Sequence, residues 1–295
     1  MTADARPQTR APGPPLRLGR QIEVHVPRPA GDPPLRHALF DFDGTLSLLR
    51  AGWQEVMLAQ FVEVLQEAGS AEEGGELARV CREFVTRLTG RQTIYQMLQL
   101  EEEVAKRGGR PEPALQYKRE YLRRLGLQIA HRLDFLRTGA RPREDFLVAG
   151  SVRLLEGLRR AGVTCYLASG TDQEFVLEEA ALLDLTAYFA GPQGPRIYGA
   201  VDDYRSFSKE KVIARILADN GLRGPELVAF GDGYVEIENA RRAGGRTVGV
   251  ASLESGGPGW DTWKRDRLLQ VGAEVLVPDW QEAELLLAHL GVEAG

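Results

Sequence analysis

The chain has 295 residues, of which 43% are hydrophobic, and its formal net charge is −5. This length is compatible with two domains, and this composition is sufficient for a packed core. The negative charge argues against nucleic acid as the main partner, because nucleic acids select basic surfaces. No apolar run reaches about 18 residues, so no membrane span is predicted. The sequence starts without a secretory signal pattern, and we therefore expect a cytoplasmic protein.

The N-terminal segment divides into a polar tail and a short strand. Residues 1–20 are rich in Pro and Arg, and we expect them to be disordered. Residues 22–26 alternate apolar and polar side chains, as a strand at the edge of a sheet would. Residues 1–30 are therefore predicted to be a disordered or edge-strand extension. Residues 37–40 are apolar and are predicted to form the first strand of the core.

A long helical region follows this strand. Apolar residues recur at three- and four-residue spacing in four segments, and glycines and prolines separate the segments. The predicted helices span residues 52–68, 75–89, 91–107 and 112–137. We expect residues 48–146 to form an inserted helical domain.

From about residue 147, short apolar strands alternate with helices. The predicted strands are 163–168, 226–230, 246–250 and 274–277, the predicted helices are 151–161, 172–183, 209–220, 235–243, 262–271 and 280–290, and residues 186–200 resemble a hairpin. This alternation predicts an α/β fold with a Rossmann-like parallel sheet and helices on both faces. The core would comprise residues 31–47 and 147–295. Such sheets bind ligands at the carboxyl ends of their strands.

Polar residues are found at three of these predicted strand ends. They are Asp41-Phe42-Asp43-Gly44-Thr45 after the first strand, Ser169-Gly170-Thr171 after the second, and Asp232-Gly233 with Glu236 after the third. Lys209 starts the helix that precedes the third of these strands. Because the carboxyl ends of parallel strands meet at one edge, these residues are expected to form a single site.

The residue types suit the transfer of a phosphoryl group. A phosphate monoester repels an anionic nucleophile, so its attack needs a divalent cation and fixed positive charge. Asp41 can act as the nucleophile, because carboxylates form aspartyl-phosphates. Mg²⁺ prefers oxygen ligands, which Asp41, the backbone carbonyl of Asp43 and Asp232 can supply. The Asp43 side chain can protonate the leaving oxygen and later deprotonate water.

The second strand end and the lysine supply the positive side of the predicted site. Ser169 and the N–H groups after it are predicted to open a helix and to bind phosphoryl oxygens. Thr171 with Glu174 also fits a capping box, so part of this motif could simply begin the helix. Lys209 would reduce the repulsion among the carboxylates and the phosphoryl group.

These elements, in this order, resemble the haloacid dehalogenase (HAD) superfamily, most of whose members are phosphatases. The chain looks most similar to the phosphoserine and phosphoglycolate phosphatase type, in which a helical cap follows the first motif. Residues 48–146 occupy the place of that cap. The resemblance implies that Asp41 is the nucleophile and that Asp43 is the acid and base. It also implies that the Ser169 hydroxyl binds phosphate, that Lys209 is the lysine of the family's site, and that Asp232 binds the metal.

Two positions leave alternatives open. Glu236 stands where the family often has Asp, and it could bind the metal through a water or only tune Asp232. Lys211 lies two residues from Lys209. We prefer Lys209 because it precedes the helix, whereas Lys211 should point along it.

Substrate contacts are predicted from both parts of the chain. Ser169, Gly170, Thr45 and Arg50 are assigned to substrate binding. Arg50, Trp53, Arg91 and Gln92 could face the substrate from the cap, or they could pack in the cap and lie on its surface. A basic cluster, Trp263-Lys264-Arg265 with Arg267, follows the glycine-rich stretch 255–259. We favour an exposed helix start over a rim that attracts an anionic substrate.

The leading hypothesis is a Mg²⁺-dependent phosphatase that acts on a small phosphorylated metabolite, such as a sugar phosphate, through an aspartyl-phosphate. Asp43 distinguishes it from a dehalogenase, which needs no acid at that position. A phosphomutase would use the same residues and is the alternative, and a binding protein on the same fold is the third hypothesis. The four histidines lack the spacing of a zinc site, and both cysteines fit buried apolar positions.

Overall fold

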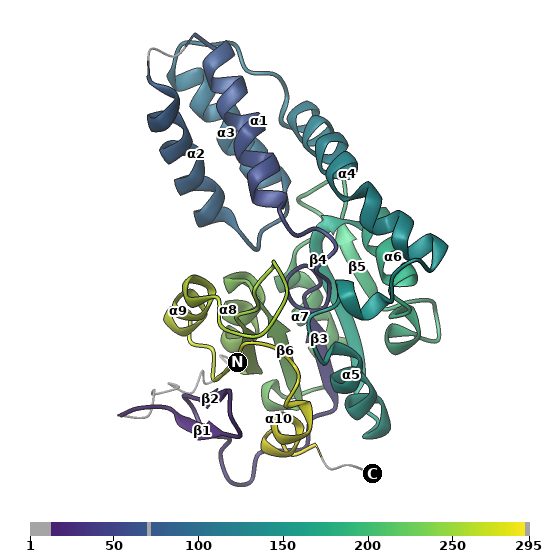
Figure 1. The fold of residues 1–295 in the computed structure, drawn as a ribbon. Coiled ribbons are helices and arrows are strands. Elements are labelled where there is room, and N and C mark those ends of the chain that lie inside the picture. The colour runs from purple at the N-terminus through teal and green to yellow at the C-terminus, as the bar shows by residue number, and fades with distance from the viewer. Residues whose placement is uncertain (1–12, 70–71, 293–295) are drawn as a thin grey trace.

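The computed structural model describes residues 13–69 and 72–292, and it shows a sheet covered by helices with a helical cap projecting from it (Figure 1). The strands are β1 (Leu16–Leu18), β2 (Ile22–Val24), β3 (His37–Phe40), β4 (Thr164–Asp172), β5 (Ile197–Ala200), β6 (Leu227–Gly231), β7 (Arg246–Val250) and β8 (Val275–Val277). The cap helices are α1 (Trp53–Glu67), α2 (Gly74–Leu88), α3 (Ile94–Lys106) and α4 (Ala114–Thr138). The core helices are α5 (Ser151–Arg160), α6 (Gln173–Leu182), α7 (Lys209–Asp219), α8 (Tyr234–Arg242), α9 (Thr262–Gln270) and α10 (Ala283–His289), with short 3-10 turns η1 (Arg143–Phe146), η2 (Thr186–Phe189) and η3 (Gly224–Glu226).

The sheet has the strand order β1-β2-β8-β7-β6-β3-β4-β5. Strands β3 to β8 pair in parallel, and β2 joins the edge antiparallel to β8, which confirms the predicted α/β class. β3 lies between β4 and β6, with Phe40 opposite Leu167 on one side and Phe230 on the other. The three polar motifs therefore follow three adjacent strands, as expected for a site at one sheet edge.

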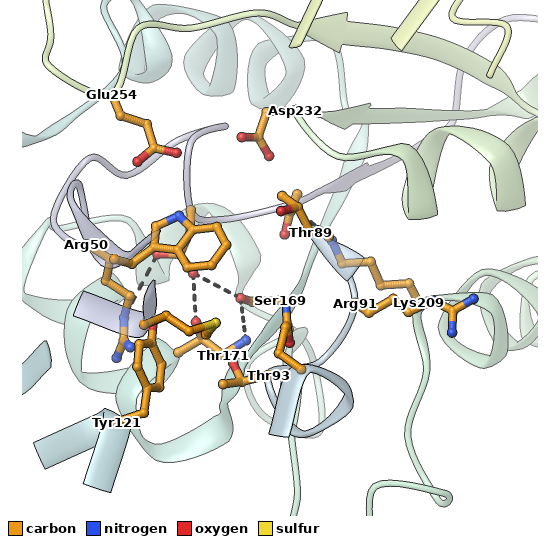
Figure 2. Close-up of a pocket in the computed structure, with 17 residues that line it drawn as sticks. Arg50, Thr89, Arg91, Thr93, Tyr121, Ser169, Thr171, Lys209, Asp232 and Glu254 are labelled. Atoms are coloured by element: carbon orange, nitrogen blue, oxygen red, sulfur yellow. Dashed lines mark hydrogen bonds and ion pairs between the residues drawn. The ribbon is translucent and has the colours of Figure 1, made fainter. Parts of the chain in front are cut away.

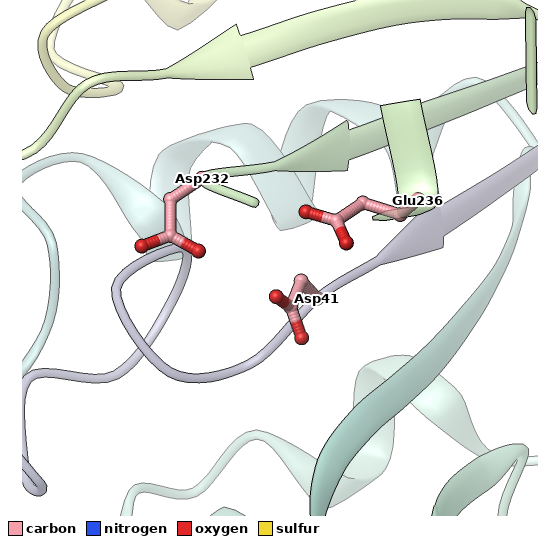
Figure 3. A group of neighbouring side chains, drawn as sticks. All are labelled: Asp41, Asp232 and Glu236. Atoms are coloured by element: carbon pink, nitrogen blue, oxygen red, sulfur yellow. The ribbon is translucent and has the colours of Figure 1, made fainter. Parts of the chain in front are cut away.

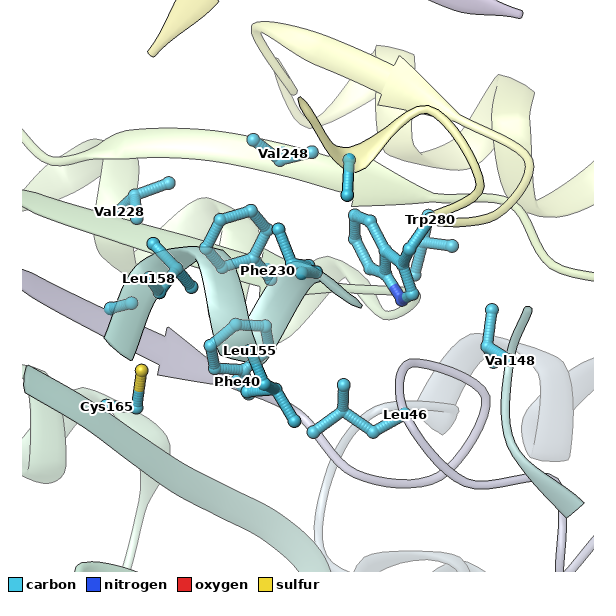
Figure 4. Packing of buried hydrophobic residues seen from close by; sticks show 14 of the residues in the cluster. Phe40, Leu46, Val148, Leu155, Leu158, Cys165, Val228, Phe230, Val248 and Trp280 are labelled. Atoms are coloured by element: carbon cyan, nitrogen blue, oxygen red, sulfur yellow. The ribbon is translucent and has the colours of Figure 1, made fainter. Parts of the chain in front are cut away.

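The strands place alternate side chains on opposite sides of the sheet. Helices cover both sides, so both faces are buried. Phe40 and Phe230 pack on the face covered by α5, α6 and α10. Leu39 and Ala229 pack on the other face, against α7 and α8. Figure 4 shows the first face, where the Phe40 and Phe230 rings stack with centroids 4.6 Å apart and Trp280 meets Phe230 edge-on at 5.6 Å. These rings lie directly beneath the loop that carries Asp41.

The cap helices share an apolar cluster of their own. Phe61 of α1, Leu77 of α2, Leu100 of α3 and Leu125 of α4 are buried in it. The buried residues of this cluster are separate from those on the sheet, and Leu133 of α4 packs against both, so the amphipathic faces predicted for these segments pack mainly on one another. None of the described helices combines the length and apolarity needed to cross a membrane.

Two sequence expectations were wrong in detail. Residues 16–18, expected to be disordered, form β1 and pair with the predicted edge strand; residues 1–12 of that tail lie outside the described residues. The predicted hairpin at 186–200 is instead the turn η2 followed by β5, which runs parallel to β4. Helix α6 returns the chain to the start of the sheet, so the next strand runs in the same direction as β4.

Candidate active site

The loop after β3 is a tight turn held by its own backbone. The N–H groups of Thr45, Leu46 and Ser47 all point to the carbonyl of Phe42, at 3.2, 2.9 and 2.9 Å. Gly44 has a φ of +74°, which glycine adopts without a side-chain clash. A Cβ atom at Gly44 would also lie 2.1 Å from Asp232 Oδ2. Glycine is therefore needed both for the turn and for the approach of Asp232.

Three neighbouring groups fix this loop against the core. Asp232 N donates a hydrogen bond to Thr45 Oγ1 (3.0 Å), and Trp280 Nε1 donates to Thr45 O (2.7 Å). Ser252 Oγ donates to Gly44 O. Thr45 is fully buried and does not line the cavity described below. We propose that Thr45 positions Asp232, in place of the substrate contact predicted from sequence.

Three carboxylates converge at the carboxyl ends of β3 and β6, as Figure 3 shows. Asp41, Asp232 and Glu236 each offer an oxygen atom within 4.8 Å of the others. Glu236 uses both oxygens already, because Oε1 accepts from Gly233 N and Oε2 contacts Lys209 Nζ, each at 2.8 Å. Asp41 is engaged in the same way, because its Oδ1 accepts from Phe42 N and its Oδ2 contacts Lys209 Nζ, each at 2.8 Å. The hard oxygens of all three carboxylates fit Mg²⁺. The two roles left open for Glu236 therefore both stay predictions.

Lys209 provides the fixed positive charge next to Asp41. Its Nζ lies 2.8 Å from Asp41 Oδ2, and the side chain is buried. Burial lowers the pKa of Lys209, but Asp41 and Glu236 together raise it above its ordinary value. Burial raises the pKa of Asp41, and Lys209 opposes that increase. Lys211 contacts only the backbone at Arg205 O and is exposed, which favours Lys209 as predicted.

Asp43 lies across the site and is held by the second motif. Its Oδ2 accepts hydrogen bonds from Thr171 Oγ1 (2.8 Å) and Ser169 Oγ (3.3 Å). Its Oδ1 is buried and accepts no hydrogen bond from any residue that the structure describes. The Arg50 Nε atom is 4.0 Å away from this oxygen. Asp43 is thus oriented through one oxygen and has the other available for a proton.

The second motif lies at the end of a strand, as predicted, but the strand is longer than the predicted 163–168, and Ser169 does not open the helix. β4 continues to Asp172, and α6 starts at Gln173 with Asp172 as its N-cap. The capping box predicted for Thr171 and Glu174 is therefore absent. The pairing of β4 with β5 shifts register between Ala168 and Asp172. Such irregularities redirect side chains near active sites, and here the hydroxyls of Ser169 and Thr171 reach Asp43.

A cavity of about 90 Å³ lies between these groups and the cap. Figure 2 shows side chains from both sides around it, with Ser169 and Thr171 on the core side and Tyr121 and Thr93 on the cap side. The cap residues that line it are Arg50, Trp53, Met57, Thr89, Gly90, Arg91, Thr93, Gln96 and Tyr121. Five of these, Met57, Thr89, Thr93, Gln96 and Tyr121, have no sequence motif that marks them. Only the position of the cap over the sheet identifies them as residues that line the cavity.

The cap residues that the sequence singled out have different positions. Arg50 lines the cavity, but its guanidinium forms a double ion pair with Glu179 at 2.7 and 3.0 Å and lies over the Phe175 ring. It is therefore held by the core, and its role in substrate binding stays a prediction. Trp53 and Arg91 also line the cavity. Gln92 does not, because its amide donates to backbone carbonyls of the 204–207 loop.

The basic cluster lies at the start of α9, as favoured from the sequence, and Trp263 is exposed, but Lys264 is not. Lys264 is buried, and its Nζ lies 2.8 Å from Asp232 Oδ2 and 3.4 Å from Glu254 Oε1. Burial alone lowers the pKa of Lys264, but these two carboxylates raise it above its ordinary value. A lysine that shares one helix face with the buried Leu268, four residues on, could have indicated this burial.

Several polar contacts join the cap to the core around the cavity. Lys118 of α4 forms an ion pair with Asp172 at the end of β4 (2.5 Å). Arg91 donates to the Tyr234 hydroxyl (2.9 Å). Arg267 of α9 stacks on the Tyr234 ring and donates to carbonyls at the end of α2, including that of Arg87. The cap therefore lies closed over the carboxylate cluster.

Comparisons with known proteins agree with this geometry. A family model for haloacid dehalogenase-like hydrolases matches residues 35–244, more than half of the chain. A search of curated proteins returned no match.

Solved structures share the fold at low sequence identity. A conserved haloacid dehalogenase-like protein of unknown function from Agrobacterium tumefaciens is 22% identical, with a TM-score of 0.53, 87% of this chain covered and 99% of the other. A predicted phosphoglycolate phosphatase from Haemophilus somnus is 14% identical (TM-score 0.54, coverage 86% and 97%). A HAD family hydrolase from Deinococcus radiodurans with bound phosphate and sodium is 18% identical (TM-score 0.50, coverage 88% and 97%).

The family match covers the first motif, the cap, the strand ends that carry Ser169 and Asp232, and the start of α7 with Lys209. It confirms the resemblance drawn from the sequence motifs, and the solved structures confirm the fold class. The chain therefore belongs to the haloacid dehalogenase-like hydrolases.

Proposed function

We propose that this protein is a Mg²⁺-dependent phosphatase that hydrolyses a small phosphate monoester through an aspartyl-phosphate on Asp41. The observation that carries this proposal is the pair of aspartates at the end of β3. Asp41 is buried beside Lys209, while Asp43 is oriented by two hydroxyls and keeps Oδ1 without a hydrogen bond from the described residues. One carboxylate is thus placed for attack and the other for proton transfer.

In the first step an Asp41 oxygen forms a bond to phosphorus as the ester P–O bond breaks. Asp43 Oδ1 donates its proton to the leaving oxygen, and the alcohol departs neutral. Lys209 compensates part of the negative charge that the phosphoryl oxygens carry. The hydroxyls of Ser169 and Thr171 keep Asp43 in position throughout.

In the second step a water molecule attacks phosphorus, and the bond between phosphorus and Asp41 breaks. The water gives its proton to Asp43, which is then ready for the next substrate. Inorganic phosphate leaves, and the Asp41 carboxylate is restored. Closure of the cap over the site excludes bulk water until the alcohol has gone.

A divalent cation fits the carboxylate pair of Asp41 and Asp232, with the backbone carbonyl of Asp43 as the predicted third protein ligand. When bound, Mg²⁺ would neutralise charge between the carboxylates and the phosphoryl oxygens. Glu236 would keep Lys209 in place, since its Oε2 accepts from Lys209 Nζ.

The cavity supports a small substrate. Its volume of about 90 Å³ lies under the closed cap, and apolar side chains such as Trp53 and Met57 line it beside polar ones such as Thr93 and Gln96. Such a lining suits a compact metabolite with an apolar face and a few hydroxyl groups, for example a sugar phosphate. The cytoplasmic location favoured by the sequence stays a prediction.

Phosphate release tests the proposal. The purified protein, freed of metal with EDTA and then supplied with MgCl₂, is incubated with a panel of phosphate monoesters, and inorganic phosphate is measured. We expect Mg²⁺-dependent release from one class of small ester. Conversion of a sugar 1-phosphate to its isomer without phosphate release would instead identify a mutase. No turnover on any ester would contradict the enzymatic proposal.

A further inference from the structure

A second buried lysine, Lys264, contacts the carboxylate cluster at Asp232, whereas Lys209 contacts it at Asp41 and Glu236. Lys264 Nζ lies 2.8 Å from Asp232 Oδ2, and the side chain is only 5% exposed. The geometry of this contact is that of an ion pair only, because Nζ makes no well-directed hydrogen bond with any described residue. An ammonium group that is buried without good hydrogen bonds is unfavourable unless charge holds it there.

The charges around Lys264 explain its position. Asp41, Asp232, Glu236 and Glu254 are four carboxylates in and around the cluster, whereas Lys209 already pairs with Asp41 and Glu236. Asp232 and Glu254 are left, and Lys264 lies between them, at 2.8 and 3.4 Å. Figure 2 shows both of these carboxylates on the same side of the cavity, away from Ser169 and Thr171. Lys264 thus neutralises the half of the site that Lys209 does not reach.

We propose that Lys264 is an internal counter-ion that competes with the divalent cation for Asp232 and so sets the metal affinity of the site. In the metal-free protein it balances the buried Asp232 carboxylate. When a dication binds, the two positive charges repel, and Glu254 offers the ammonium a second partner. This inference rests on the proposed metal site, and it concerns a residue outside the sequence motifs that define that site.

The proposal makes a prediction that a purely structural role does not. A unit charge within about 5 Å of a bound dication changes its binding by about tenfold even at the dielectric of bulk water, and by more at the lower effective dielectric of a protein. Removing the Lys264 charge should therefore strengthen Mg²⁺ binding and, at the same time, lower the stability of the metal-free protein. A side chain that only packs would lower stability equally with and without the metal.

The experiment is a calorimetric titration of EDTA-treated full-length protein with MgCl₂, together with melting temperatures in EDTA and in saturating Mg²⁺. Lys264→Met removes the charge but keeps the side-chain length, and Lys264→Arg keeps the charge. Lys211→Met is the matched control, since Lys211 is exposed and contacts only a backbone carbonyl. We expect Lys264→Met to bind Mg²⁺ about tenfold more tightly or better. Its melting temperature should fall in EDTA and rise more on addition of Mg²⁺.

Equal or weaker Mg²⁺ binding by folded Lys264→Met would overturn the inference. If that variant does not fold, Lys264→Gln, which keeps a donor for Asp232, is measured in its place with the same expectation. If neither folds in EDTA, Mg²⁺ should restore folding, and failure to do so would also overturn the inference. Absence of Mg²⁺ binding by the unmodified protein and by every variant would contradict the proposed metal site itself.

Discussion

The floor and the roof of the cavity are built in different ways. The floor is formed by loops at the ends of adjacent parallel strands, where backbone hydrogen bonds and the Trp280 side chain fix the Asp41 turn. The roof is formed by helices α1–α4, which pack on their own apolar cluster. The roof meets the floor through polar side chains, such as Lys118 and Arg267, and through apolar side chains near the end of α4, such as Leu133.

We infer from this difference that the floor carries out the reaction and that the roof selects the substrate. The floor positions the reacting atoms through the register of β3 with β4 and β6. The roof supplies side chains that line the cavity, where the leaving group of the substrate would lie. Its polar contacts with the floor would break when the cap opens and form again when it closes. Changes in the floor should therefore lower kcat for every substrate, whereas changes in the roof should act on KM and on the ranking of substrates.

The largest effect is expected for Asp41→Asn in the floor. An amide cannot attack phosphorus as a carboxylate does, so turnover should fall by more than about 10⁴-fold for all substrates. The fold should persist, because burial already disfavours the ionised form of Asp41 and raises its pKa. Steady-state phosphate release measures the first effect, and circular dichroism measures the second. Near-normal hydrolysis by this variant would disprove the nucleophile assignment.

The next effect is expected for Asp43→Asn. The amide can still accept from Thr171 Oγ1, so the geometry should be retained while proton transfer is lost. We expect kcat to fall by about 10²- to 10⁴-fold. The loss should be smaller for aryl phosphates, whose leaving groups need no proton. An equal loss for alkyl and aryl esters, measured as kcat, would argue against general acid catalysis by Asp43.

A smaller effect is expected where the roof meets the floor. Arg267→Ala removes the hydrogen bonds to the carbonyls at the end of α2, including that of Arg87, and should favour the open cap. We expect KM to rise by about tenfold, the range of one or two charged hydrogen bonds, with a smaller change in kcat. Arg123→Ala is the control, because Arg123 is exposed on α4 and pairs with Glu120 of the same helix. A loss confined to kcat would mean that Arg267 acts on the chemistry.

The smallest effect is expected for a single polar group of the roof. Thr93→Val removes a hydroxyl that lines the cavity and keeps the side-chain shape. Esters that use this hydroxyl should lose about two- to tenfold in kcat/KM, and esters with small leaving groups should be unaffected. Thr138→Val, on the exposed end of α4, is the matched control. A uniform loss across the panel would contradict the division between floor and roof.

The sequence predicted the floor better than the roof, for a physical reason. Strand ends that carry Asp41, Ser169 and Asp232 are adjacent in any parallel sheet of this type, so their convergence follows from local patterns. The cap lining depends on how α1–α4 dock, which no local pattern encodes. Thr93 and Tyr121 therefore could not be recognised in advance.

Lys264 shows the same limit within the floor. A charged residue near a helix start is exposed by default, and only the position of α9 beside the end of β6 reveals that Lys264 reaches Asp232. The strand before the Ser169 motif was predicted to end at residue 168, too early, for a related reason. The shift in pairing that extends β4 to Asp172 depends on β5, which lies thirty residues further along the chain.

The most direct test of the central claim is detection of the phosphorylated nucleophile. The protein is mixed with Mg²⁺ and a substrate found in the ester panel, quenched in acid during turnover, digested, and analysed by tandem mass spectrometry. The account predicts one phosphoryl group on the peptide that contains residues 41–45, located on Asp41 and absent from Asp41→Asn. A phosphoryl group on another residue, or phosphate release with no labelled peptide under conditions that preserve acyl phosphates, would contradict it.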